Sequence, residues 1–175
     1  NFNYEYDFID KKLNEQVSPV RQAGALWGLS LIHQAYPSKE SNTAILKGIE
    51  FYVKNSVEKD SSMSYIVYPN SSSGKTGTMA LTCLGIIDFL RTEGECVYEE
   101  ELLALLDQYI NFVLTLRTEN GQFHSGYYHP DGVAKGDPSP YFDGETLLML
   151  VKAAKYMGYD SLKPLLLESA EAMYQ

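Results

Sequence analysis

Apolar and polar positions divide the chain into helical segments of two alternating kinds. Three segments are apolar on nearly all sides, as buried helices are, and lie at about 19–36, 76–91 and 143–157. Three others carry a single apolar stripe with charged residues elsewhere, as surface helices do, and lie at about 42–55, 98–117 and 161–174. A surface helix follows each buried helix. The pattern therefore predicts three helical hairpins.

The three buried helices align with one another without gaps. When Ser18-Pro19 is placed over Ser72-Ser73 and Ser139-Pro140, apolar positions coincide along all three segments. Short aromatic stretches with period-two alternation precede the buried helices and indicate short strands or hairpin arms. We interpret residues 1–175 as one all-α domain of about three helical hairpins that form an arc, with short strand-like aromatic loops. The alternative is an irregular helical bundle whose helices share only their capping chemistry.

Composition excludes several function classes. The net charge of −9 argues against nucleic-acid binding, which needs a clustered basic surface. No run of 18 apolar residues exists, so we expect no membrane span. Cys83 and Cys96 have no partners at metal-ligand spacing, and no complete phosphate-binding or dinucleotide motif occurs, so we expect no metal and no cofactor. The chain begins with Asn1, and its cellular compartment stays open.

Two stretches carry a resemblance to a known superfamily. "LRTENGQFHSGYY" with "SPYFDGETLLMLVKAAKYMG", and the earlier "VRQAGALWGLSLIHQAYP", resemble hairpins of the α/α-toroid proteins, which include six-hairpin glycosidases and terpenoid-cyclase-like toroids. Such toroids normally carry five to seven hairpins, and this chain supplies about three. The resemblance therefore implies a partial toroid, with inner helices around a central axis and a cavity at their N-terminal ends. In glycosidases of this architecture the cavity holds sugar between aromatic rings and carboxylates.

Polar residues occur where the chain enters the predicted inner helices. Arg21, Gln22 and Lys75 lie at the first two helix starts and are candidate substrate contacts, while Asp143 and Glu145 lie at the third and are candidate catalytic carboxylates. Asp143 has two interpretations, because an aspartate at a helix start is also a good N-cap. Glu145 is expected in the first helical turn, where the helix dipole would lower the pKa of its carboxyl.

The loop before the third inner helix supplies candidate rim residues. His124, Tyr127, Tyr128 and Tyr141 combine apolar faces with hydrogen-bonding groups, which suits sugar rings. Glycoside hydrolysis needs two carboxylates on opposite sides of one bond. Asp143 and Glu145 are too close in sequence to flank a bond readily. The second carboxylate would then come from elsewhere, with Glu5, Asp7, Asp131 and Asp137 as candidates.

Three functions remain open at this stage. The first is a carbohydrate-binding or carbohydrate-processing domain, with glycoside hydrolysis as the leading reaction. The second is a non-catalytic structural or interaction domain of a larger protein, whose arc ends would pair with a second copy or with further hairpins of a longer chain. The third is a terpenoid-cyclase-like toroid that binds an apolar substrate.

Overall fold

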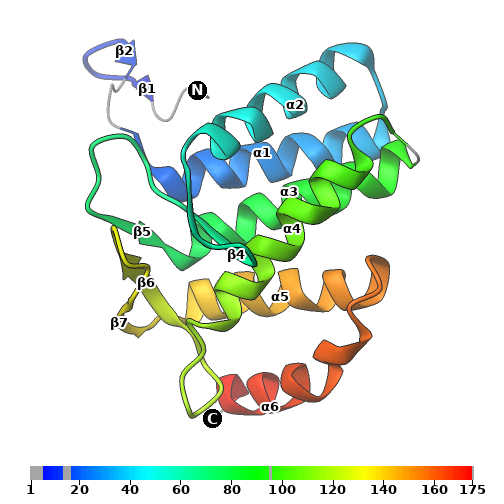
Figure 1. Cartoon of the computed structure of the whole chain (residues 1–175). Coiled ribbons are helices and arrows are strands. Elements are labelled where there is room, and N and C mark those ends of the chain that lie inside the picture. The colour runs from blue at the N-terminus through cyan, green and yellow to red at the C-terminus, as the bar shows by residue number, and fades with distance from the viewer. Residues whose placement is uncertain (1–5, 14–16, 95, 175) are drawn as a thin grey trace.

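A computed structural model describes residues 6–13, 17–94 and 96–174. Three helices form an inner layer in which they lie side by side: α1 (Pro19–Ala35), α3 (Thr76–Glu93) and α5 (Pro140–Tyr156). Each is followed by a helix of the outer layer: α2 (Lys39–Lys54), α4 (Glu99–Leu114) and, after the short 3-10 helix η1 (Asp160–Leu162), α6 (Lys163–Tyr174). Figure 1 shows the two layers, with α3 between α1 and α5. The predicted alternation of inner and outer helices is present.

Short antiparallel strands connect the hairpins, so the purely helical description is incomplete. β1 (Tyr6–Asp7) pairs with β2 (Lys12–Leu13), and β3 (Ser56–Asp60) with β4 (Met63–Ile66). A three-stranded sheet joins β5 (Ser73–Lys75), β6 (His124–Tyr128) and β7 (Ala134–Pro138). β5 leads directly into α3 and β7 almost directly into α5, so this sheet fixes the N-terminal ends of two inner helices.

The starts of the inner helices differ from the prediction at α5. Ser18 caps α1 by accepting a hydrogen bond from the Arg21 amide, and Pro19 takes the first helical position. The same Ser-Pro pair begins α5 at Pro140, three residues before the predicted start at 143. Asp143 therefore lies inside the first turn and is not an N-cap, and Glu145 lies beyond that turn.

The core is centred on α3. Every residue from Thr76 to Leu90 is buried, because α1, α5 and α4 cover different sides of the helix. The contact with α1 is close: a Cβ placed on Gly85 would lie 3.6 Å from the Trp27 Cα. Tyrosines from the strand-like segments also enter the core, and the ring of Tyr65 stacks on Phe112 with 4.8 Å between centroids.

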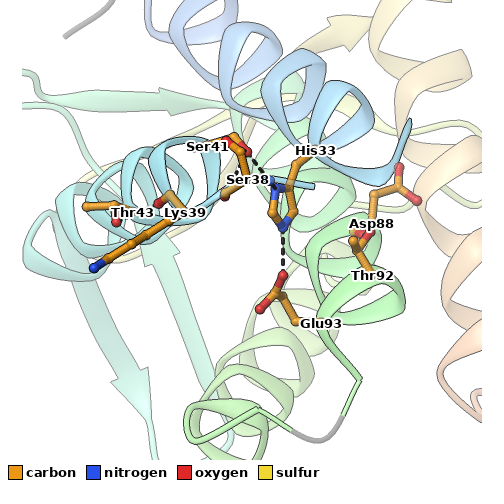
Figure 2. Close-up of polar contacts among 8 residues, drawn as sticks. All are labelled: His33, Ser38, Lys39, Ser41, Thr43, Asp88, Thr92 and Glu93. Atoms are coloured by element: carbon orange, nitrogen blue, oxygen red, sulfur yellow. Dashed lines mark hydrogen bonds and ion pairs between the residues drawn. The ribbon is translucent and has the colours of Figure 1, made fainter. Parts of the chain in front are cut away.

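A buried histidine joins three helices at the C-terminal end of α1. His33 Nδ1 lies 2.6 Å from Ser41 Oγ of α2, and Nε2 lies 2.7 Å from Glu93 Oε1 of α3 (Figure 2). The Ser41 amide donates to Ser38 Oγ, which caps α2. Although a serine, a histidine and an acid meet here, Ser41 Oγ also lies 3.1 Å from the Ser38 carbonyl oxygen, and His33 is buried. The geometry is that of a helix cap that connects α1, α2 and α3.

We predict that His33→Ala lowers the free energy of unfolding by about 2 kcal/mol, because two hydrogen bonds are lost and one of them involves a carboxylate. Urea denaturation measures the change. Tyr36→Ala is the matched control, since Tyr36 follows the same helix and is 79% exposed. Equal stability of the two variants would contradict the role assigned to His33.

Candidate functional site

The aligned polar positions of the inner helices gather at one end of the inner layer. Gln22 on α1, Thr76 on α3 and Asp143 on α5 are all buried within the first turn of their helices. Buried polar side chains cost free energy unless they are hydrogen-bonded. The Thr76 hydroxyl donates to the His124 carbonyl oxygen, and thereby ties the start of α3 to β6. This end is the N-terminal mouth that the sequence predicted as the site.

Asp143 anchors the turn that precedes β6. Its Oδ1 accepts a hydrogen bond of 2.8 Å from the Phe123 amide, and its Oδ2 accepts one of 3.3 Å from Gln122 Nε2. Burial raises the pKa of the Asp143 carboxyl, and these two donors oppose the rise. Both carboxylate oxygens are thus used to hold residues 122–123 against α5. This arrangement makes Asp143 a positioning residue.

Glu145 is in a different environment. Its side chain is half-buried, and its Oε2 is buried with no hydrogen-bond partner among the described residues. The carboxyl lies against the backbone of α3: a Cβ placed on Gly77 would be 2.5 Å from Oε2. Burial raises the pKa of Glu145 to about 7. The expectation that the helix dipole lowers this pKa is therefore wrong, because desolvation dominates beyond the first turn.

A carboxyl with a pKa near neutrality can both donate and accept a proton. General acid–base catalysis is most efficient when the pKa of the group lies near the working pH. A perturbed pKa in a group without a structural partner is also a general indicator of functional sites. Of the two candidate carboxylates, Glu145 is the one that has both a pKa near neutrality and, among the described residues, an oxygen without a hydrogen-bond partner.

Two threonines at the same end also carry unpartnered hydroxyls. Thr78 Oγ1 and Thr146 Oγ1 are buried without hydrogen-bond partners in the described part of the chain. Thr78 lines a pocket of about 140 Å³ together with Lys75, Ser73 and Tyr68. Tyr68 also borders a pocket of about 230 Å³ that includes Gln22. Sequence reasoning did not single out Thr146 or Tyr68, although a threonine within an apolar helix is a detectable signal.

The predicted rim residues have divergent environments. Tyr128 and Tyr141 are exposed, and Lys135 Nζ lies 4.6 Å from the centroid of the Tyr128 ring. His124 Nδ1 lies 2.8 Å from the Gly136 carbonyl oxygen and supports the pairing of β6 with β7. Tyr127 is fully buried, and its hydroxyl donates to the Ile66 carbonyl oxygen. We therefore leave Tyr127 out of the proposed site.

The other predicted residues lie at the periphery. Arg21 and Lys75 are exposed at the starts of α1 and α3. Asp131 accepts a hydrogen bond from the Val133 amide, and Asp7 accepts from two amides in the turn after β1. Asp137 is exposed on β7, and Glu5 lies outside the described residues. No hydrogen bond or ion pair links Asp7, Asp131 or Asp137 to Glu145 in the described part of the structure.

Comparison with solved structures assigns the fold. The chain superposes on a cellobiose 2-epimerase from Bacillus thermoamylovorans with a TM-score of 0.75 at 10% identity, covering 95% of this chain and 47% of that one. A sugar epimerase from a ruminal bacterium gives 0.71 at 14% identity, with 93% and 46% covered. An alpha-mannanase of family GH76 from Bacteroides thetaiotaomicron gives 0.64 at 15% identity, with 93% and 47% covered.

These neighbours are α/α toroids of the six-hairpin glycosidase type, and the chain spans about half of their length. The chain therefore shares the helical-hairpin fold of about half of these structures, which supports the partial toroid that the resemblance implied. No protein-family model matches the sequence, and a search of curated proteins finds no relative.

Among the described residues, no group of three or more His, Cys, Asp or Glu side chains is placed to hold a metal ion. None of the described helices has the length and apolar character needed to cross a membrane.

We predict that Glu145→Gln raises the melting temperature at pH 8 and leaves it unchanged at pH 4. The folded-state pKa of about 7 exceeds the ordinary value of 4.5, so the folded state binds more protons between these values. Stability associated with Glu145 is thus present below pH 4.5 and is lost as the pH rises to 7. Glutamine removes this loss because it stays neutral.

The control for this measurement is Glu171→Gln, which changes an exposed glutamate on α6. Thermal melts of the three proteins across pH 4–8 make the comparison. The assignment is contradicted if the difference between Glu145→Gln and wild type is the same at pH 4 and pH 8.

A second prediction concerns Gly77, the glycine of α3 whose backbone lies against the Glu145 carboxyl. Alanine normally stabilises a helix interior relative to glycine by about 0.5–1 kcal/mol, and Gly28→Ala in α1 should do so because nothing lies within 4 Å of the added methyl group. Gly77→Ala should not stabilise the protein, since its methyl group would displace the Glu145 carboxyl and the Phe142 ring. If the added methyl group moves the Glu145 carboxyl toward water, burial should raise its pKa less. The Gly77→Ala variant should then lose less stability than the wild-type protein between pH 4.5 and 7. Chemical denaturation at both pH values tests this pair, and a gain in Gly77→Ala equal to that in Gly28→Ala would refute the contact.

Proposed function

We propose that this chain forms a carbohydrate-processing site in which Glu145 transfers the proton. The observation that carries the proposal is the half-buried Glu145 carboxyl at the N-terminal mouth of the inner helices, whose pKa is about 7 and whose Oε2 has no hydrogen-bond partner among the residues that the structure describes. The fold supports it, because the neighbouring toroids are named as sugar epimerases and a mannanase. The exposed rings of Tyr128 and Tyr141 supply stacking surfaces near the start of α5.

Two reactions are candidates for this site: hydrolysis of a glycosidic bond, and proton transfer at a sugar carbon. Glycoside hydrolysis requires a second carboxylate across the scissile bond. Asp143 is poorly suited to that role, since both of its oxygens hold the turn at residues 122–123. Isomerisation of an aldose to a ketose needs a group such as Glu145 to take the C2 proton and deliver it to C1, with a second proton moving between the two oxygens, whereas 2-epimerisation needs the proton to return to the opposite face of C2. We keep hydrolysis and epimerisation as the two reactions to be assayed side by side.

A panel of neutral and acidic mono- and oligosaccharides provides the test, first by thermal shift and calorimetry and then by turnover. Reducing-end release reports hydrolysis, and proton NMR of the product sugars reports epimerisation. Glu145→Gln keeps the shape of the side chain, so binding should persist while turnover falls about 10²–10⁴-fold. The rate of the wild-type protein should change around pH 7, where Glu145 titrates.

Glu171→Gln serves as the control and should retain wild-type turnover. The proposal fails if no sugar binds, or if turnover is unchanged in Glu145→Gln. A failure of binding across the whole panel would favour the second candidate function, an interaction domain.

One observation favours that second candidate. The inner helices at the two edges of the arc expose apolar side chains, with Ile32 of α1 59% exposed and both Leu148 and Val151 of α5 41% exposed. Such surfaces are usually covered by a partner. An interaction domain without a sugar site should either self-associate through these edges or require further hairpins to cover them. Light scattering at increasing protein concentration detects the self-association.

A further inference from the structure

A second polar cluster lies on the inner layer, away from the mouth. Asp88 of α3 is fully buried, and its partners come from all three inner helices: Trp27 Nε1 of α1 donates to Oδ2 at 2.8 Å, Arg91 Nη1 of α3 donates to Oδ1 at 2.8 Å, and Lys152 Nζ of α5 donates to Oδ2. In the described part of the chain, all hydrogen bonds to this carboxylate come from the inner helices. The cluster therefore joins the three inner helices to one another.

The cluster contains more positive than negative charge. Asp88 is its one carboxylate among these contacts, and it faces both Arg91 and Lys152. A third cation joins them, since Lys155 Nζ lies 4.9 Å from the centroid of the Tyr156 ring, and the Arg91 guanidinium lies 3.7 Å from the same centroid. Three cations against one carboxylate leave an excess of two positive charges, in a protein whose net charge is −9.

The pKa of the Tyr156 phenol agrees with this excess of positive charge. Its pKa is lowered, first by a hydrogen bond with Lys155 and further by the charges of Lys155, Arg91 and Lys152. Asp88 fixes Arg91 and Lys152 in place, and their side chains remain 26% and 15% exposed. These two cations are thus held in position before any ligand arrives, which reduces the entropy lost on binding.

The cluster shares a helix face with Glu145. Residues 145, 152 and 156 are separated by seven and four positions, which places them on one side of α5. At 1.5 Å per residue, Glu145 and Lys152 lie about 10.5 Å apart along the helix axis. Met149 lies between them on the same side of α5 and is buried, while Leu148, on the neighbouring side, is 41% exposed.

We propose that Arg91, Lys152 and Lys155 form a binding site for the anionic group of an acidic sugar substrate, a carboxylate or a phosphate. This inference rests on the proposed function, and it adds that the substrate carries negative charge about two helical turns from the carbon or oxygen that Glu145 serves. The Trp27 and Tyr156 rings border the cations and supply apolar contacts for the sugar.

A competing explanation exists for part of the cluster. Arg91 and Lys155 lie in the last turns of α3 and α5, where cations stabilise the helix dipole. Lys152 lies a turn earlier and is held by Asp88, so the dipole does not account for it. A pure dipole role predicts that removing Lys155 changes stability and has no effect on ligand affinity.

The test compares three probes of similar shape by calorimetry: glucose, glucuronate and glucose 6-phosphate. We expect both charged sugars to bind at least tenfold more tightly than glucose at 20 mM salt, a difference of about 1.4 kcal/mol, since a charge-assisted hydrogen bond is stronger than a neutral one. The advantage should shrink at 0.5 M salt. The ratio of the glucuronate and glucose 6-phosphate affinities identifies whether the site prefers a carboxylate or a phosphate.

Lys155→Gln is the decisive variant, because it removes a cation and leaves the contacts of Asp88 intact. It should weaken glucuronate and glucose 6-phosphate binding about tenfold and leave glucose binding unchanged. Lys163→Gln is the control, since Lys163 pairs with Asp160 on the surface at the start of α6. Equal affinity for glucose and both charged sugars, or a Lys155→Gln variant altered only in melting temperature, would overturn the proposal.

The two proposals fail in different ways. If neutral sugars bind and turnover depends on Glu145, but charge brings no advantage, the anion site alone is wrong. If none of the sugars binds, both proposals are wrong.

Discussion

The burial of α3 from Thr76 to Leu90 is the constraint on which the rest of the structure depends. A helix covered on all sides must satisfy every polar side chain it carries or leave it at a free-energy cost. Thr82 donates to the Thr78 carbonyl oxygen, Thr76 donates to the His124 carbonyl oxygen, and Asp88 gathers donors from α1, α3 and α5. These bonds fix the neighbouring helices and β6 around α3. Thr78 lines a pocket, and its hydroxyl has no hydrogen-bond partner in the described part of the chain.

The same desolvation that shapes α3 separates the roles of the two acids on α5. Asp143 and Glu145 are two residues apart, so they point to different sides of the helix. Asp143 meets a backbone amide and a glutamine, which favour its charged form and offset the cost of burial. Glu145 lies against the backbone of α3 at Gly77, and its Oε2 meets no hydrogen-bond donor among the described residues that would favour the charged form. Neighbours on other elements, and not helix position, thus determine which acid titrates near neutrality.

The sequence predicts the helices well, because hydrophobic periodicity reports which faces are buried, and the alternation of apolar and amphipathic segments is present as two layers. The Ser-Pro pairs at residues 18–19 and 139–140 even mark two inner-helix starts. The role of Asp143 was not predictable in this way, since its partners lie about 20 residues earlier and depend on the fold of a turn. Tyr127 was misplaced for a similar reason: in a strand of period two, the sequence does not say which face meets the core.

The pockets at the mouth bear on how tightly a sugar can be held. Their volumes of about 140 and 230 Å³ are below the roughly 300–1,000 Å³ of typical small-molecule sites. The solved toroids are about twice as long as this chain, so they have additional hairpins with which to surround a ligand. The apolar residues exposed on α1 and α5 lie where such hairpins, or a second copy, would pack. Because a ligand enclosed on fewer sides loses less of its contact with water, the affinity of this chain alone for a monosaccharide should lie in the millimolar range, about −4 kcal/mol. Covering the edges of the arc should therefore strengthen binding without any change at Glu145.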